Sequence, residues 1–234
     1  MHYAIIAAGN GSRLVAEGVA TPKPLVKVNG EPLIDRLVRI FSENNAESIS
    51  IILNSNISSL IEHFENLKSD VVINIVNKST ISSMHSFYEL SRFLNNGKFC
   101  LTTVDTIFKE DEFSDFIKEF EQNTVSEGIM GVTNFIDDEK PLYVSTDTNM
   151  RITGFYDTPN RNADYISGGI YALTPICIKV LEHSIHSGMS RMRNYQRALV
   201  EDGIRLRAYP FTKIIDIDHA IDITAANNFL LQNV

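Results

Sequence analysis

The chain has 234 residues and a formal net charge of −8, with 44% hydrophobic and 21% charged residues. This composition is typical of a soluble globular protein that can bury a sizeable core. The acidic balance argues against a general nucleic-acid binder, and no apolar run approaches membrane-spanning length. Met1 leads directly into an apolar strand, which leaves no room for a signal peptide, and Cys100 and Cys177 lie in apolar segments as expected for buried thiols. We therefore expect a cytoplasmic protein.

In the first half of the chain, short apolar runs alternate with segments whose apolar residues recur every three or four positions. Strands are expected at residues 4–8, 48–53, 71–76 and 98–104, and helices at 32–45, 57–67 and 83–94. This alternation predicts a mostly parallel sheet with helices on both faces, with ligands bound beyond the carboxyl ends of the strands. Five residues that follow these strands should line that edge: Gly9, Gly11, Asn54, Asn77 and Asp105.

The second half has more strands that are separated by polar turns. Strands are expected at residues 128–135, 142–145, 151–156, 165–173, 205–210 and 214–217, and helices at 174–184, 189–201 and 221–231. Residues 144–157 read as a hairpin that turns at 147–149. No linker or repeat interrupts the chain, so we expect a single domain over residues 1–234 with a substrate-facing lobe at about 128–186. The expected fold class is α/β, a Rossmann-like three-layer α/β/α arrangement with a mixed, mostly parallel sheet.

The stretch AIIAAGNGSRLVAEGVATPKPLVK, residues 4–27, carries the most specific pattern. Gly9 and Gly11 follow the first strand and allow backbone angles that are closed to other residues, so N–H groups can approach an anion closely. Arg13 and Lys23 add two positive charges, and the prolines on either side of Lys23 restrict its backbone. A strand, a glycine turn and two cations indicate a site for a polyphosphate.

Other glycine-loop motifs fit this stretch less well. A dinucleotide-binding fingerprint needs a third glycine where Leu14 stands, and a Walker loop needs Gly-Lys-Ser/Thr directly before a helix. The simplest alternative is a glycine-bearing surface loop with two solvated cations.

The full string A-A-G-x-G-S-R-L…P-K-P-L resembles the signature of the nucleotidyltransferase superfamily that includes sugar-phosphate, phosphocholine and molybdopterin nucleotidyltransferases. The resemblance implies a nucleotide-diphospho-sugar transferase-like fold and a transferase that moves an NMP group from an NTP to a phosphorylated acceptor. It also implies catalytic roles for Arg13 and Lys23. The implied nucleotide-binding residues are Ala7, Ala8, Gly9, Asn10, Gly11, Ser12, Arg13 and Lys23.

Acidic residues at two strand ends are candidate Mg²⁺ ligands. Asp105 ends the run LTTVD, and Asp216 and Asp218 lie in IIDIDHAID. Mg²⁺ binds in proteins through one or two carboxylates together with phosphate oxygens and water. The resemblance makes Asp105 the first metal ligand and Asp218 the second, with Asp216 as the fallback, although the family's Thr-Pro after this position is His219-Ala220 here.

The acceptor side is expected at two further segments. ISGGIYAL, residues 166–173, resembles the family's N-A-G-I-Y strand, and Gly168 and Gly169 would let an acceptor lie against the backbone; a bulge at this point is the structural alternative. FYDTP, residues 155–159, stands where sugar-phosphate members carry Glu-Lys-Pro, so Asp157 would hold hydroxyl groups. Thr158 replaces the lysine that meets the acceptor phosphate.

The expected partners are a nucleoside triphosphate and a phosphorylated small molecule, with neither nucleic acid nor membrane. A sugar phosphate is favoured over an amino-alcohol phosphate, whose cationic head group would instead contact Tyr156, Asp157 and Tyr171. Two other functions remain open. A metal-dependent glycosyltransferase could use Asp216 and Asp218 as an Asp-x-Asp pair, and a non-catalytic module could bind a nucleotide through the glycine loop alone.

Overall fold

The first strand, β1 (His2–Ala7), lies at the centre of the main sheet because β4 and β6 both pair with it in parallel. The computed structural model describes residues 1–65, 69–136, 139–161 and 163–231. Side chains of β1 alternate between the faces of the sheet: Tyr3, Ile5 and Ala7 enter one core, and Ala4 and Ile6 enter the other. An apolar strand that is buried on both faces needs a layer of helices on each side.

The main sheet has nine strands in the order β10-β9-β11-β6-β1-β4-β5, with β8 paired to β11 and β12 paired to β8. Its members after β1 are β4 (Ser48–Leu53), β5 (Val72–Asn77), β6 (Phe99–Thr103), β8 (Gly128–Thr133), β9 (Tyr143–Thr146), β10 (Ile152–Tyr156), β11 (Tyr165–Leu173) and β12 (Leu206–Pro210). Within this sheet, β10 and β11 run against the direction of the others. The sheet is therefore mixed and mostly parallel, as the sequence predicts.

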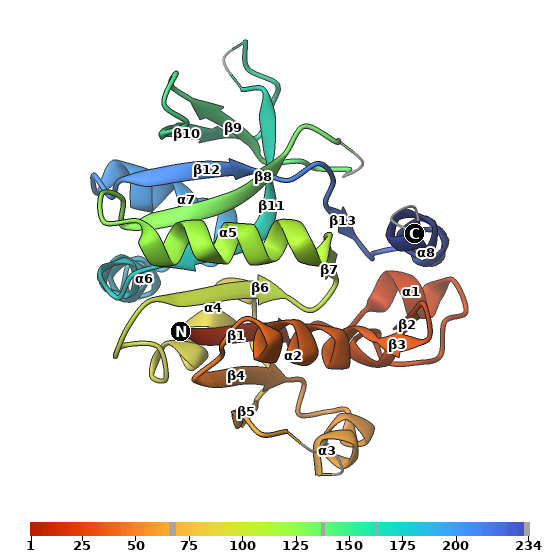
Figure 1. The fold of residues 1–234 in the computed structure, drawn as a ribbon. Helices are drawn as coiled ribbons and strands as arrows, with labels where there is room; N and C mark the ends of the chain where they lie inside the picture. Colours follow the sequence, from red (N-terminus) through yellow and green to blue (C-terminus); the bar gives the residue numbers. More distant parts are fainter. Residues whose placement is uncertain (66–68, 137–138, 162, 232–234) are drawn as a thin grey trace.

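Helices cover both faces of the sheet (Figure 1). The long helices are α2 (Leu33–Glu43), α3 (Ser58–Glu65), α4 (Ser83–Ser91), α5 (Glu110–Gln122), α6 (Ile176–His186), α7 (Met192–Glu201) and α8 (Ala220–Leu231). One core joins the sheet to α2, α5 and α8, and the other joins it to α4, α6 and α7. The fold is a three-layer α/β/α arrangement of the Rossmann-like type.

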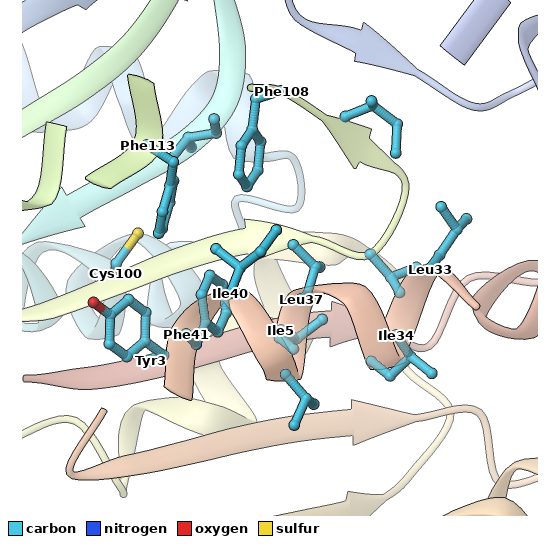
Figure 2. Close-up of a cluster of buried hydrophobic side chains, with 14 of the residues drawn as sticks. Tyr3, Ile5, Leu33, Ile34, Leu37, Ile40, Phe41, Cys100, Phe108 and Phe113 are labelled. Atoms are coloured by element: carbon cyan, nitrogen blue, oxygen red, sulfur yellow. The ribbon is translucent and has the colours of Figure 1, made fainter. Parts of the chain in front are cut away.

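Aromatic side chains fill much of the first core (Figure 2). The Tyr3 and Phe41 rings stack with centroids 4.4 Å apart, and Phe108 stacks on Phe113 at 4.7 Å. Cys100 is buried in the same cluster as a free thiol. These contacts fix α2 and the start of α5 against the sheet, so the loop between β6 and α5 has a rigid base.

Two small two-stranded ribbons lie beside the main sheet. β2 (Lys27–Val28) pairs with β3 (Glu31–Pro32), and β7 (Thr106–Ile107) pairs in antiparallel fashion with β13 (Ile215–Asp216). The second ribbon joins segments that are far apart in the chain, and Figure 1 shows it between the sheet and α8. Because Asp105 precedes β7 and Asp218 follows β13, this ribbon brings the two acidic segments together.

Most expected elements form within two residues of their predicted limits. The hairpin at 144–157 is confirmed, and Asp147 stabilises its turn by accepting hydrogen bonds from the backbone N–H groups of Asn149 and Arg151. Residues 66 and 67 of the expected helix at 57–67 lie outside the described residues. The helix α5 was not predicted, although its residues Phe113, Phe116, Ile117 and Phe120 have helical spacing and are all buried. In the part of the chain that the structure describes, no helix combines the length and apolarity needed to cross a membrane.

Candidate active site

The glycine turn after β1 forms one wall of a cavity of about 630 Å³ at the carboxyl ends of the parallel strands. Ala8, Gly9, Asn10, Gly11, Ser12 and Arg13 line it, and so do Lys23, Asn54, Asp105 and Asp218. Ala7, predicted to bind the nucleotide, is instead the last residue of β1, is 1% exposed and does not line this cavity. Asn77 also ends its strand without lining it. The cavity is the place expected for a ligand of a parallel sheet.

Gly11 is required where it stands for two reasons. Its φ of 58° lies in the left-handed region, and a Cβ atom there would lie 3.1 Å from Cβ of Lys23. Gly9 has neither constraint, because its φ is not in that region and nothing lies within 4 Å of its would-be Cβ. The prediction that both glycines need backbone angles closed to other residues is right for Gly11 and wrong for Gly9.

Lys23 is the hub of the charged groups. It begins the short 3₁₀ helix η1 (Lys23–Leu25), with Pro22 before it and Pro24 inside it, and its side chain is only 10% exposed. Its ammonium group donates to Asp105 Oδ2 and, at 2.9 Å, to Asp218 Oδ1. Burial by itself lowers the pKa of Lys23, but the charges of Asp105 and Asp218 reverse this and raise it. Lys23 is therefore a fixed cation at neutral pH.

Asp218 connects this hub to Arg13. The Arg13 guanidinium donates through Nη1 to Asp218 Oδ2 at 2.6 Å, so each oxygen of the carboxylate meets a different cation. Partial burial by itself raises the pKa of Asp218, but Lys23 and Arg13 outweigh it and hold the pKa below its usual value. The sequence predicts that Asp218 and Asp105 meet across the glycine loop, and the structure brings both to one ammonium group. Asp216 lies on β13 and, in the part of the chain that the structure describes, is not one of the two carboxylates that accept a hydrogen bond from Lys23.

The two carboxylates fit the needs of Mg²⁺. Asp105 Oδ2 and Asp218 Oδ1 both lie within hydrogen-bond reach of one nitrogen, so their oxygens converge on one point. Mg²⁺ is commonly bound by one or two carboxylates while phosphate oxygens and water complete its octahedron. No group of three or more His, Cys, Asp or Glu side chains among the described residues could hold a metal by itself. The donor set is that of a metal shared with a phosphate ligand.

A second, smaller pocket of about 70 Å³ adjoins the first. Its lining includes Ile166, Ser167 and Gly168 of β11, Phe135, and Asp216 and His219 near β13. Arg13 and Asp218 line both cavities and therefore stand at their border. Two ligands, one in each cavity, would meet at these charged side chains.

Gly168 and Gly169 form a bulge in β11. The register between β11 and β8 shifts between Ser167 and Ile170, and Gly169 has a φ of 72°. A Cβ atom on Gly168 would collide with the side chain of Ile214. The alternative of a bulge is therefore confirmed, while the close approach of an acceptor to this segment stays a prediction; Gly168 itself lines the smaller pocket.

Asp157 lies away from both cavities. Its carboxylate binds the guanidinium groups of Arg193 at 2.5 Å and Arg197 at 2.7 Å, both on α7. Hydrogen bonds from both arginines hold its pKa below the usual value. The suggestion that Tyr156, Asp157 and Tyr171 surround a cationic head group is not supported, because Tyr171 is 6% exposed and its hydroxyl accepts a hydrogen bond from Gln196.

Comparison with known proteins identifies the family of the chain. The model of the nucleotidyl transferase family matches residues 3–233. The chain belongs to the nucleotidyl transferase family. Nucleotidyl transferase relatives include the bifunctional protein GlmU of Methanococcus vannielii, 23% identical over 249 aligned residues that cover the whole chain and 56% of GlmU. The chain thus spans about half the length of the GlmU relatives that it matches.

A shorter match is to the choline-phosphate cytidylyltransferase of Streptococcus pneumoniae, which is 34% identical over 90 residues that make up 38% of each chain. Among solved structures, the inositol-1-phosphate CTP transferase from T. maritima superposes with a TM-score of 0.80 at 18% identity, covering 100% of this chain and 97% of its own. UDP-glucose pyrophosphorylase from Acinetobacter baumanii superposes with a TM-score of 0.81 at 16% identity, covering 99% and 94%. Both structures confirm the fold.

Several residues that line the larger cavity were not predicted from the sequence. Thr80, Ser82, Ser83 and Ser86 line the larger cavity at the start of α4, while Phe87 and Leu90 of the same segment are buried in the core. The helical periodicity was visible in the sequence, and the serines on its other face were the signal for a polar wall.

A clasp between the two ends of the chain was also missed. Glu17, directly after the short helix α1 (Ser12–Ala16), accepts hydrogen bonds from the Ala220 backbone N–H at 2.7 Å and from the His219 ring at 2.5 Å. This contact ties the glycine loop to the segment that carries Asp218. No local pattern announces it, because the partners lie at opposite ends of the sequence.

Proposed function

We propose that the chain is a Mg²⁺-dependent nucleotidyltransferase that moves an NMP group from an NTP to a phosphorylated small-molecule acceptor and releases pyrophosphate. The observation that carries the proposal is the charged cluster where two cavities adjoin: Arg13 and Asp218 stand at the border, and Lys23, which binds both Asp105 and Asp218, lies with Asp105 on the larger side. The larger, bounded by the glycine turn, suits the triphosphate, and the smaller, bounded by Gly168, suits the reactive end of the acceptor.

In this reaction an oxygen of the acceptor phosphate attacks the α-phosphorus of the NTP. A new P–O bond forms, the bond from the α-phosphorus to the bridging oxygen breaks, and pyrophosphate leaves with the electron pair. The attacking phosphate is already anionic near neutral pH, so the chain needs no general base. Its task is to position two anions and to neutralise the charge that builds up between them.

The residues divide this task by position. Lys23, which is fixed and nearly buried, would meet the α-phosphate, and the more exposed Arg13 would hold the β- and γ-phosphates. Asp105 and Asp218 would hold Mg²⁺, which when bound supplies charge neutralisation at the phosphate oxygens. Because the two cations and two carboxylates are paired with one another here, triphosphate binding must exchange these ion pairs for contacts between cations and phosphates.

For the acceptor we propose a sugar phosphate, with an amino-alcohol phosphate such as phosphocholine as the second candidate. The glycine bulge of β11 supports close approach of a sugar, and the match to the choline-phosphate cytidylyltransferase favours the second candidate. For Asp157 to contribute to hydroxyl recognition in this proposal, its carboxylate would have to exchange Arg193 and Arg197 for the acceptor. We further propose one domain over residues 1–234, acceptor contacts from the lobe at about 128–186, and a cytoplasmic location, where nucleoside triphosphates are available.

A screen for pyrophosphate release tests the proposal. The purified protein is assayed with each of ATP, CTP, GTP, UTP and dTTP against hexose 1-phosphates, inositol 1-phosphate and phosphocholine, with Mg²⁺ and with EDTA. We expect release for one combination of triphosphate and acceptor, and loss of release in EDTA. Triphosphate binding without turnover of any pair would favour a nucleotide-binding module, and release of a nucleoside diphosphate from a sugar nucleotide would favour a glycosyltransferase.

A further inference from the structure

Arg36 is a charged side chain inside the hydrophobic core. It lies on α2 among Leu33, Leu37 and Ile40, and it is 2% exposed. Its Nη2 donates a hydrogen bond of 2.6 Å to the backbone carbonyl of Phe108, and its guanidinium carbon lies 5.1 Å from the centre of the Phe108 ring. Burial lowers the pKa of Arg36 to about 10, so the side chain is still charged at neutral pH.

The other two nitrogens of this guanidinium have incomplete hydrogen bonding. Nε and Nη1 are buried and have no hydrogen-bond partner, and the nearest carboxylate oxygen, on Glu110, lies 3.8 Å from Nε. Glu110 is instead engaged by two hydrogen bonds of 2.9 Å from Arg39. A buried charge with incomplete hydrogen bonding destabilises a fold, and an apolar side chain of similar volume is often better tolerated. Stability therefore does not account for an arginine at this position.

The carbonyl that Arg36 holds belongs to the ribbon that carries the acidic groups. Phe108 directly follows β7, and Asp105 directly precedes it. β7 pairs with β13, and the carbonyl of Asp105 accepts a hydrogen bond of 3.1 Å from the Ile217 backbone N–H. Figure 2 shows Phe108 above α2, where the chain leaves β7. Arg36 therefore holds one end of β7, and Asp105 stands at the other end.

We propose that Arg36 is a positioning residue for the metal carboxylates: by holding the Phe108 carbonyl from inside the core, it sets where the β7–β13 ribbon places Asp105 relative to Asp218. The proposal rests on the proposed function, in which these two carboxylates share Mg²⁺ with the triphosphate. A misplacement of about 1 Å in such a site can lower turnover by ~100-fold, so one hydrogen bond at the base of the ribbon can matter.

The test compares Arg36→Met with Arg39→Met. Methionine fills the core but cannot donate to the Phe108 carbonyl, so we expect an unchanged or higher unfolding midpoint together with turnover lowered by about 10- to 100-fold. Mn²⁺ affinity in the presence of a non-hydrolysable NTP analogue, measured by calorimetry, should fall by about 10-fold, whereas affinity for the metal-free analogue should not. Arg39→Met removes the more exposed arginine on the same helix. Its turnover and its Mn²⁺ affinity should stay within about two-fold of the parent values.

Arg36→Lys is the second variant, because it keeps a charge and a donor. It should recover part of the Mn²⁺ affinity and turnover that Arg36→Met loses, and it keeps the test decisive if the methionine variant does not fold. Arg36→Met or Arg36→Lys with parental turnover and Mn²⁺ affinity would overturn the proposal. So would a loss of activity that only follows a lower unfolding midpoint, since that is what a structural role predicts. Failure of the proposed function is separate: it would appear as parental activity that survives EDTA or Asp105→Asn.

Discussion

The two sides of the active cleft are built in different ways. On the triphosphate side, residues 8–13 come from one turn after β1, and Lys23 follows shortly after in the chain. On the acceptor side, the pocket draws on the end of β8, on the bulge of β11 and on residues 214–222 beyond β12. The turn and the lysine of the first side are encoded in one continuous stretch, although Asn54, Asp105 and Asp218 complete its cavity, whereas the second side exists only when distant strands pair. We therefore expect substitutions on the triphosphate side to abolish turnover, and substitutions on the acceptor side to change which acceptor is used.

The largest effect should come from Asp105, which links the two sides through the ribbon. Asp105→Asn keeps an acceptor for Lys23 but removes a charge that Mg²⁺ needs, so turnover should fall by about 1,000-fold, the upper end for one preorganised electrostatic contact. Pyrophosphate release as a function of Mg²⁺ concentration measures it. Of the two carboxylates in and just after β13, Asp218→Asn should lose more turnover than Asp216→Asn; the reverse order would favour Asp216 as the second metal ligand.

Lys23→Ala should lower turnover by more than ~100-fold, because a fixed charge at the α-phosphate is lost. It should also have a second effect that no other substitution shares. Without the ammonium group, Asp105 and Asp218 repel each other, so the variant should be less stable than the parent, and millimolar Mn²⁺ should restore part of its unfolding midpoint. In the parent, the lysine occupies the two carboxylates, so Mn²⁺ without nucleotide should raise the unfolding midpoint less than in the variant. An equal rise in the parent would contradict this expectation.

The two glycines of the turn form a matched pair. Gly11→Ala places a methyl group 3.1 Å from Lys23 and forces a left-handed φ on alanine, so we expect turnover lowered by roughly 10-fold or more together with a loss of about 1 kcal/mol in the free energy of unfolding. Gly9→Ala meets no neighbouring atom and should leave the free energy of unfolding within about 0.5 kcal/mol of the parent. Chemical denaturation and steady-state kinetics measure both. Equal losses of stability in the two variants would contradict this assignment.

On the acceptor side, Gly168→Ala forces Ile214 to move and fills the smaller pocket. The KM for the acceptor should rise by about 10-fold, while the affinity for the triphosphate, measured separately by calorimetry, should change by less than about two-fold. A parallel loss of triphosphate affinity would show that the two sides are not separate.

The smallest effect is expected for Thr158→Lys, which restores a cation beside Asp157. If the acceptor is a sugar 1-phosphate, its KM should fall by a few-fold, the scale of one exposed charge-assisted contact. An unchanged or raised KM, together with turnover of phosphocholine by the parent protein, would favour the amino-alcohol phosphate. Because Asp157 already binds Arg193 and Arg197, a new lysine that only joins this cluster would leave the KM unchanged.

The sequence alone determined the parts of the protein whose cause is local. Apolar runs and helical spacing located nearly every strand of the main sheet and most of the helices that cover it. The string from Gly9 to Lys23 indicated a polyphosphate site before any contact was known. These features depend on residues that are neighbours in the chain, so their physics is present in any short window of it. The cause of helix α5 is also local, because its four buried apolar residues have helical spacing, so the sequence contained the signal for it.

Only the tertiary structure decided how the charges meet. Which aspartate of the pair near the end of the chain reaches Lys23, and that Asp157 is taken by Arg193 and Arg197, depend on contacts between segments that the sequence separates widely. The same holds for Arg36: on a helical wheel it is an ordinary polar residue, and only the packing of α5 and β7 over α2 turns it into a buried cation with one backbone partner. Charge pairing and burial are set by through-space distance, which periodicity along a chain does not encode.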